Sequence, residues 1–255
     1  SDNQEAAIAV GALYEKVGAP VVVTDPASAE TIKYAANAFL ATKLSFANAI
    51  AALCEHVGAN IDDVMDGIGQ DKRIGNQFLK PGPGWGGSCF PKDTRALVKI
   101  AESAGYDFEL LRGVIDFNEI QFDRVVNKVR KAVGKTLTGT HIAVLGLTFK
   151  AHTNDLRDSP ALRIVEHLKS QGATINAYDP TVKESLHGIN IYKTATEACK
   201  SADAILIATE WPEFALLNPT EIGNVVRSKH MIDARNILEA DLWRGAGFSY
   251  QGVGR

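Results

Sequence analysis

Along the first half of the chain, apolar residues recur mostly at intervals of three, four or seven positions, the spacing of one face of an α-helix. One long helix is predicted over residues 29–57, and Gly58 fits the position just beyond a helix C-terminus. Further helices are predicted over residues 60–69, 91–105 and 111–133. The first half is therefore expected to be helical, interrupted by a Gly/Pro-rich loop at 81–90.

After a polar Gly/Thr linker at 134–139, the pattern changes to short apolar runs separated by helical segments. Strands are predicted over residues 141–147, 173–180, 204–209 and 230–235. Helices are predicted between them over residues 159–172 and 195–203. Strands that alternate with helices imply a parallel sheet covered on both faces. The predicted fold class is therefore α/β, with a helical central domain followed by a Rossmann-like parallel-sheet domain.

Residues 1–25 differ from both patterns, because they predict one helix followed by a short strand over PVVVTD, residues 20–25. The same order arises when a chain is cut inside an αβ repeat. We therefore expect this segment to be the remnant of a further domain. The predicted organisation is a remnant at 1–25, a helical domain at 26–133 and a sheet domain at 134–255.

Composition and charge exclude several classes of protein. Apolar residues make up 45% of the chain and charged residues 22%, an ordinary globular balance. The net charge of −3 provides no basic field for nucleic acid. No apolar run approaches the ~20 residues of a membrane helix. The three cysteines match no metal-ligand spacing, and no signal pattern begins the chain, so we expect a reduced, cytoplasmic protein without a metal.

The stretch PGPGWGGSCFPKD, residues 81–93, contains three glycines in the spacing G-x-G-x-x-G. A dinucleotide fingerprint requires a strand before this motif, and the prolines of the stretch disfavour a strand. The turn after the strand 141–147, with Gly146, fits the order of strand, turn and helix better. Asp179 ends the next strand, where an acid could contact a ribose. A sheet that binds no nucleotide remains the alternative.

Cys89 lies in the same stretch, two residues before Pro91, where a helix is predicted to begin. The positive end of a helix favours a thiolate at such a position, and Asp93 follows within the first turn. This arrangement suits covalent catalysis through the sulfur, and a buried structural cysteine is the alternative. Cys54 and Cys199 fall within helical patterns, so we interpret both as structural.

Lys33 and Asn37 are four positions apart on the helix predicted over 29–57, so they share one of its faces. Such a pair usually belongs to a solvated face. The pair is a candidate for a functional site only if the loop that contains Cys89 packs over it.

Several motifs occur in a fixed order along the chain: ETIKYAANAFLATKLSFANAIA, GIGQDKRIGNQFLKPGPGWGGSCFPKDTRAL, LGLTFKAHTNDLRDSPA, YDP, TEWPEF and DARNIL. Together they resemble the nucleotide-sugar 6-dehydrogenase family. The resemblance runs from about Ala29 to Arg255, and GGSCFPKD is its most specific part. Members of this family oxidise the C6 alcohol of the sugar to a carboxylate, with two hydride transfers to NAD. The motifs favour the branch that takes UDP-glucose.

The resemblance also implies residue roles. Cys89 would capture the sugar aldehyde as a thiohemiacetal that becomes a thioester. Lys33 and Asn37 would hydrogen-bond the C6 oxygen, and Asp93 with Lys33 would orient the hydrolytic water. Arg157 would contact NAD from across the cleft. The residues that would bind the nucleotide sugar are Arg73, which would reach the sugar of a neighbouring subunit, and Phe78, Lys80, Trp85, Gly86, Phe149, Lys150 and Arg235.

The family also has an N-terminal NAD-binding domain with a glycine fingerprint, and only its last helix and strand correspond to residues 1–25. We therefore expect the chain to be a fragment that is inactive alone and forms a homodimer through its helical domain. Three alternatives stay open. The chain could be a UDP-sugar-binding and dimerisation module without activity, part of a dehydrogenase for another nucleotide sugar such as GDP-mannose, or a cysteine acyl-transfer enzyme unrelated to NAD.

Overall fold

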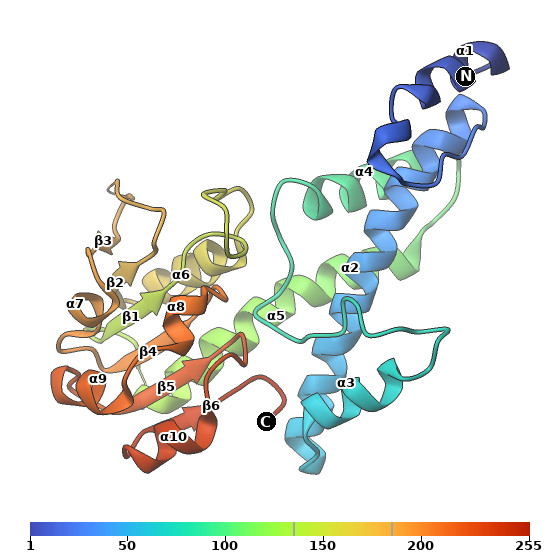
Figure 1. Ribbon diagram of the computed structural model, residues 1–255. Coiled ribbons are helices and arrows are strands. Elements are labelled where there is room, and N and C mark those ends of the chain that lie inside the picture. Colours follow the sequence, from blue (N-terminus) through green and yellow to red (C-terminus); the bar gives the residue numbers. More distant parts are fainter. Residues whose placement is uncertain (135, 185) are drawn as a thin grey trace.

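The computed structural model describes residues 1–134, 136–184 and 186–255. A helical half and a sheet half are joined by the long helix α5, Glu109–Val133 (Figure 1). The linker predicted at 134–139 follows α5, and its residue Lys135 lies outside the described residues. The predicted order of a helical half before a sheet half is confirmed.

The helical half contains α2 (Pro26–Val57), α3 (Ile61–Gly69) and α4 (Phe90–Ser103) beside α5. Helix α2 begins after Asp25, whose carboxylate accepts a hydrogen bond from the backbone N–H of Ser28. It ends at Gly58, whose φ of 76° is the left-handed conformation expected there. The predicted helices therefore form within a few residues of their expected bounds.

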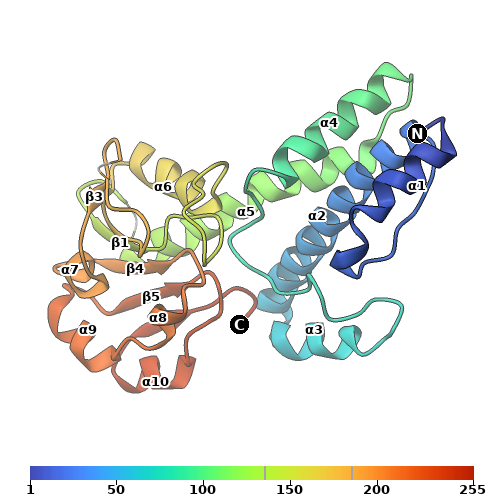
Figure 2. The same ribbon diagram turned by 45° about the horizontal axis from the view of Figure 1, so that its top comes forward.

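By length and composition alone, α2 could cross a membrane, which differs from the expectation that no segment would qualify. Its polar residues argue for a different environment. Ser45 and Asn48 are buried on this helix and hydrogen-bond the loop around residues 82–85. The apolar face of α2 packs with α4 and α5, which lie beside it in Figure 2. Protein therefore packs against part of this helix, whose most apolar stretch is 39% buried.

The sheet half consists of six parallel strands in the order β3-β2-β1-β4-β5-β6. The strands are β1 (His141–Leu145), β2 (Thr174–Tyr178), β3 (Asn190–Ile191), β4 (Ala204–Ile207), β5 (His230–Asp233) and β6 (Ser249–Gln251). The connecting helices are α6 (Pro160–Ser170), α7 (Ala195–Cys199), α8 (Pro212–Ala215), α9 (Pro219–Val225) and α10 (Ala240–Gly245). This is the doubly wound arrangement that the alternating pattern predicts. The pattern missed β3 and β6, which are only two and three residues long.

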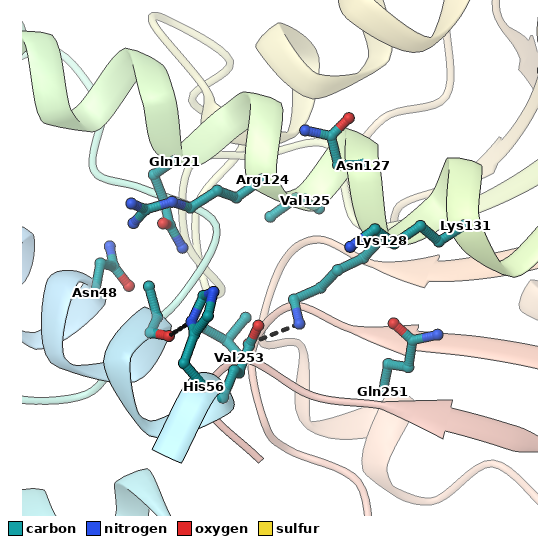
Figure 3. A pocket seen from close by; sticks show the side chains of 12 residues that line it. Asn48, His56, Gln121, Arg124, Val125, Asn127, Lys128, Lys131, Gln251 and Val253 are labelled. Atoms are coloured by element: carbon teal, nitrogen blue, oxygen red, sulfur yellow. Dashed lines mark hydrogen bonds and ion pairs between the residues drawn. The ribbon is translucent and has the colours of Figure 1, made fainter. Parts of the chain in front are cut away.

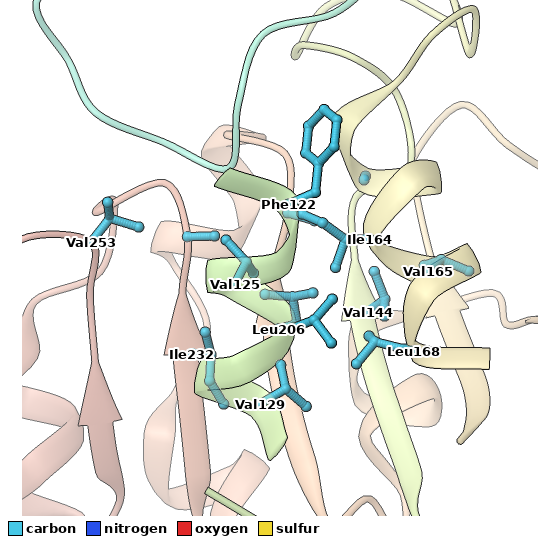
Figure 4. Close-up of a cluster of buried hydrophobic side chains, with 14 of the residues drawn as sticks. Phe122, Val125, Val129, Val144, Ile164, Val165, Leu168, Leu206, Ile232 and Val253 are labelled. Carbon is cyan, nitrogen blue, oxygen red and sulfur yellow. The ribbon is translucent and has the colours of Figure 1, made fainter. Parts of the chain in front are cut away.

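Helices α5 and α6 cover one face of the sheet (Figure 4). Phe122, Val125 and Val129 of α5 belong to the same buried cluster as Val144 of β1 and Leu206 of β4. A second buried cluster, which includes Phe214 and Trp243, lies under α7 to α10. The C-terminal part of α5 is therefore part of the core of the sheet half, which fixes the sheet relative to the helices.

The first 25 residues form α1 (Gln4–Ala12) and a short 3₁₀ turn, Glu15–Val17. The helix was predicted, but the strand over 20–25 is wrong, because the segment has no regular structure and pairs with no strand among the described residues. A strand needs a neighbour for its backbone N–H and C=O groups, and the six-stranded sheet lies in the other half of the molecule (Figure 1). Its valines Val21, Val22 and Val23 are exposed.

Candidate active site

The glycine loop that precedes Cys89 is fixed to the helices by buried amide side chains. The backbone N–H of Gly82 donates to Asn48 Oδ1 at 2.8 Å, and its carbonyl accepts from Gln121 Nε2 at 2.8 Å. Asn118 bonds both backbone groups of Trp85, at 2.8 and 2.9 Å. A loop without secondary structure thus satisfies its buried backbone groups through side chains of α2 and α5.

The glycines of this loop are required by close packing against the sheet half. Gly87 has a φ of 83°, and a Cβ atom on it would lie 2.7 Å from the ring of Phe149. A Cβ atom on Gly86 would overlap the carbonyl oxygen of Asp158. The backbone N–H of Gly87 donates to that same oxygen at 3.2 Å. Gly86 and Gly87 therefore allow the loop to pack closely against the sheet half. No strand precedes the glycines of this loop, although a dinucleotide-binding turn requires one.

Cys89 caps the N-terminus of α4, and its carbonyl accepts from the backbone N–H of Asp93 at 2.8 Å. Pro91 occupies the first turn, as predicted. Cys89 is exposed, whereas Cys54 and Cys199 are buried. Burial raises the pKa of the Cys199 thiol to about 12, which keeps it protonated at neutral pH. Of the three thiols, Cys89 is therefore the one available for chemistry.

Asp93 is the centre of a polar cluster between α2 and α4. Its side chain has no exposed surface, and its Oδ2 accepts from Lys33 Nζ at 2.5 Å and from Asn37 Nδ2 at 2.6 Å. Lys92 Nζ bonds its other oxygen. Burial acts to raise the pKa of Asp93, but the hydrogen bonds from Lys33, Lys92 and Asn37 outweigh it and lower this pKa to about 2. Asp93 is therefore a carboxylate at neutral pH.

The cluster places Lys33 and Asn37 against the first turn of α4, which begins directly after Cys89. Helices α2 and α4 pack against each other, and Asp93 lies one helical turn after Cys89. A nucleophilic sulfur, a cationic donor, an amide donor and a carboxylate thus come from two helices that are fixed by packing. Such a set can add a thiolate to a carbonyl, donate to the oxygen that gains charge, and orient a water molecule.

A cavity of about 570 Å³ lies between the helical half and the sheet half, and Lys80 and Arg235 are among the residues that line it. Arg235 Nε donates to the Ala208 carbonyl at 3.0 Å, and Nη2 donates to the Phe149 carbonyl at 3.2 Å. Glu210 Oε2 lies 3.0 Å from Arg235 Nε. The guanidinium is thereby held at the carboxyl end of the sheet, where open α/β sheets bind ligands.

Arg157 lies in the sheet half and pairs with a neighbouring carboxylate. Asp155 accepts from its Nε at 2.9 Å and from its Nη2 at 2.7 Å. Hydrogen bonding to Asp155 raises the pKa of Arg157, and the charge that Cys89 can carry adds to this rise. The same hydrogen bonds lower the pKa of Asp155 to about 2. Arg157 is thus a fixed cation within electrostatic range of Cys89.

The remaining residues predicted to bind the substrate do not form a cluster with one another. Phe78 is exposed, with its ring centroid 6.3 Å from that of Phe90. Lys150 Nζ is exposed and lies 5.3 Å from the ring centroid of Phe149. Arg73 points to solvent with 89% of its side chain exposed, and it pairs with Asp71.

Trp85 differs from these residues because its indole is buried. Only 5% of the residue is exposed, and Nε1 donates to Ser45 Oγ at 2.9 Å. The ring packs in the helical core with Leu111 and Val114. The side chain therefore anchors the loop, and the Trp85 backbone, which is buried and paired with Asn118, does so as well.

Asp179 does not have the role predicted for it. It is buried, and its Oδ2 accepts from the backbone N–H groups of Leu147 at 2.8 Å and Thr148 at 3.1 Å, and from Trp211 Nε1 at 3.2 Å. It is therefore not a free acid for a ribose hydroxyl. Because Asp179 occupies the N–H groups of the turn after β1, this turn does not fit the diphosphate of a dinucleotide either.

Comparisons with known proteins match the chain in two parts. The central domain of the UDP-glucose/GDP-mannose dehydrogenase family matches residues 27–120, and the UDP binding domain of that family matches residues 143–240. UDP-glucose 6-dehydrogenase TuaD of Bacillus subtilis (strain 168) is 45% identical over 260 residues, which cover 100% of this chain and 56% of that protein.

Two solved structures are similar to the fold. A UDP-glucose dehydrogenase from the hyperthermophilic archaeon Pyrobaculum islandicum has a TM-score of 0.88 and 33% identity, over 99% of this chain and 57% of the other. A UDP-D-ManNAc dehydrogenase from Pyrococcus horikoshii has a TM-score of 0.87 and 32% identity, over 99% and 58%. The chain thus spans a little more than half the length of these relatives.

Proposed function

The chain belongs to the UDP-glucose/GDP-mannose dehydrogenase family, and we propose that it is the catalytic-cysteine and UDP-binding portion of an NAD-dependent UDP-glucose 6-dehydrogenase. The observation that carries this proposal is the convergence of Lys33 and Asn37 on the buried Asp93, one turn after the exposed Cys89. The reaction is the four-electron oxidation of the sugar C6 alcohol to a carboxylate.

The residues of the cluster have distinct roles in this proposal. The Cys89 thiolate adds to the C6 aldehyde, and the oxygen of the resulting thiohemiacetal receives hydrogen bonds from Lys33 and Asn37. After oxidation to the thioester, water adds to the C6 carbonyl and the C–S bond breaks, which releases the carboxylate, restores the Cys89 thiolate and passes two protons to solvent. Asp93, ionised because its pKa is about 2, accepts a hydrogen bond from that water and holds Lys33 in place.

Two NAD molecules, bound one after the other, would supply the acceptors for the two hydrides that leave the C6 carbon. On this chain we assign only Arg157 to NAD, since this cation is fixed near Cys89 and remains exposed. The turn after β1 is excluded as a diphosphate site, because Asp179 already accepts from its N–H groups. The further contacts to NAD are not assigned to this chain, and we expect the chain alone to bind sugar nucleotide without turning it over.

UDP-glucose is proposed to lie in the cavity of about 570 Å³ between the two halves. This volume is within the range of small-molecule sites. Lys80 and Arg235 are proposed to contact the diphosphate there, although the carboxylates of Asp62, Asp66 and Glu210 also line the cavity. Phe78, Phe149 and Lys150 are proposed to line the path toward Cys89, where the Phe149 ring already lies against Gly87. Trp85 and Gly86 contribute the backbone of the loop that closes it.

A homodimer through the helical half is supported by the exposed face of α2. Ile32, Phe39, Phe46 and Leu53 recur every seven residues and are each 52–66% exposed. A stripe of this length on one helix face can pack against its own copy across a two-fold axis. Arg73, which projects from the helical half into solvent, is proposed to reach the neighbouring subunit's sugar from there.

Titration calorimetry of UDP-glucose into the chain tests the binding part of the proposal. Wild-type chain is expected to bind, and Arg235→Gln to bind at least about tenfold more weakly, the loss expected for a charge-assisted hydrogen bond. The matched control Arg227→Gln removes the same charge from an exposed pair with Asp203 and should bind as wild type. Equal affinity in all three proteins would refute the assigned pocket, and steady NADH production by the chain with NAD would refute its inactivity.

A second candidate function is the oxidation of another nucleotide sugar. The similarity to a UDP-D-ManNAc dehydrogenase, with a TM-score of 0.87, supports this candidate at the level of the fold. A binding competition between UDP-glucose, an N-acetylated UDP-sugar and GDP-mannose distinguishes the two candidate functions. Preferential binding of UDP-glucose supports the first proposal, and preference for either competitor supports the second.

A further inference from the structure

A separate cavity of about 290 Å³ lies between α2, α5 and the segment that follows β6 (Figure 3). It shares no lining residue with the cavity near Arg235 or with the cluster around Asp93. Gln251 and Val253 contribute from the sheet half, and Asn48 from α2. The cavity therefore opens at the junction of the two halves, where an occupant would contact both.

The walls of this junction cavity carry an excess of positive charge. Arg124, Lys128 and Lys131 of α5 lie at positions i, i+4 and i+7, so they share one face of that helix. Glu55 is the carboxylate among the lining residues, and Lys128 pairs with it at 2.6 Å. Arg124 and Lys131 have no ion pair among the described residues, which leaves two cations for a ligand.

Two buried polar atoms beside the cavity also have no hydrogen-bond partner among the described residues. They are Nη1 of Arg124, a donor, and Oε1 of Gln121, an acceptor. The Gln121 amide is fixed, because its Nε2 donates to the Gly82 carbonyl at 2.8 Å. The Arg124 guanidinium is fixed by stacking, with its Cζ 4.7 Å from the ring centroid of Phe117. Buried polar atoms are normally paired, so these two atoms indicate a missing partner.

We propose that this junction cavity is a binding site for a small phosphate-bearing anion. Phosphate oxygens accept from Arg124 and Lys131, and a phosphate hydroxyl donates to Gln121 Oε1. Arginine suits such a ligand because its planar fork of donors matches phosphate geometry. Bound there, the anion would lie between α2 of the helical half and the strand end at Gln251 of the sheet half.

Titration calorimetry with inorganic phosphate at pH 7 tests the proposal on the 255-residue chain. Wild type is expected to bind one phosphate per chain at this site, and Arg124→Gln to bind it at least about tenfold more weakly. Lys99→Gln, which removes a charge from an exposed side chain of α4, should bind as wild type. Lys131→Gln provides a second test that does not disturb the Arg124 stacking, with the same direction of change.

Three outcomes would overturn the proposal. Wild-type chain could give no binding heat with millimolar phosphate. The Arg124 and Lys131 variants could bind phosphate as tightly as wild type. The heat could instead be lost in Arg235→Gln and kept in Arg124→Gln, which would place the phosphate in the proposed substrate cavity.

Discussion

Asp93→Asn is the substitution whose consequences the structure defines most closely. It keeps the size of a fully buried side chain but removes the charge that accepts from Lys33, Lys92 and Asn37. The fall of the Asp93 pKa from 3.8 to about 2 corresponds to about 2.4 kcal/mol of unfolding free energy. Because Lys33 and Lys92 are 59% and 64% exposed, solvent screening reduces this figure, and we expect a loss of about 1–2 kcal/mol at pH 7.

The sign of the pH dependence follows from the direction of the shift. The pKa of Asp93 is lower in the folded chain than in the unfolded one, so its stabilisation is complete above the unfolded pKa of 3.8. This stabilisation is lost as pH falls from about 4 through about 2, and both states are protonated only below that pH. The difference in unfolding free energy between wild type and Asp93→Asn should therefore be constant from pH 7 to 5 and shrink below pH 4.

Urea denaturation followed by circular dichroism at several pH values measures this difference. Asp71→Asn is the matched control, because it removes a carboxylate from an exposed pair with Arg73 and should leave the urea midpoint unchanged. Equal stability of wild type and Asp93→Asn at pH 7 would refute the claim that an ionised, hydrogen-bonded Asp93 stabilises the fold. A difference that persists undiminished at pH 3 would show that packing, rather than charge, accounts for it.

Three further predictions concern the loop and the nucleophile. Iodoacetamide should alkylate one thiol of the folded chain rapidly, as followed by mass spectrometry over time, and Cys89→Ser should abolish this fast phase. Fast labelling of a second cysteine would contradict the buried state of Cys54 and Cys199. Asn118→Ala should lower the unfolding free energy by at least about 2 kcal/mol, because it leaves the buried N–H and C=O of Trp85 unpaired; a loss below 0.5 kcal/mol by urea titration would refute the anchoring role. Gly87→Ala should destabilise the chain by about 1–3 kcal/mol, because its φ of 83° is strained for alanine and the new methyl group meets the Phe149 ring; an unchanged thermal midpoint would show that the loop can move away.

Sequence patterns predicted the regular elements well where local signals decide them. Helix α2 has a proline in its first turn, a capping aspartate before it and a glycine after it, and the four predicted strands are continuous apolar runs of a covered parallel sheet. The strand predicted over 20–25 failed because a strand exists only through pairing with a neighbour, which its own residues do not reveal. Strands β3 and β6 were missed because two or three residues carry no periodicity.

The site could be predicted only in part. The motif around Cys89 predicted a nucleophile and the carboxylate that follows it, but the meeting of Lys33 and Asn37 with Asp93 depends on how α2 packs on α4. Asp179 was misread because an acid at the end of a strand can serve its own fold, and here it fixes the neighbouring turn.

The amides that fix the glycine loop were missed altogether. Asn118 and Gln121 occupy positions that continue the apolar face of the helix containing Val114 and Val125. Polar residues at core positions are normally hydrogen-bonded, and that signal was present in the sequence. Their partner, the loop around Gly82, could be identified only from the three-dimensional arrangement.

Capture of a sugar aldehyde by Cys89, under the control of Lys33 and Asn37, is the step on which the proposed function depends. It can be tested on this chain without a cofactor, by adding the 6-aldehyde of UDP-glucose labelled with ¹³C at C6. We expect a thiohemiacetal carbon resonance in the NMR spectrum of wild type, a weaker one in Lys33→Ala, and none in Cys89→Ser. The same adduct in Cys89→Ser, or no adduct in wild type with the aldehyde bound, would contradict it.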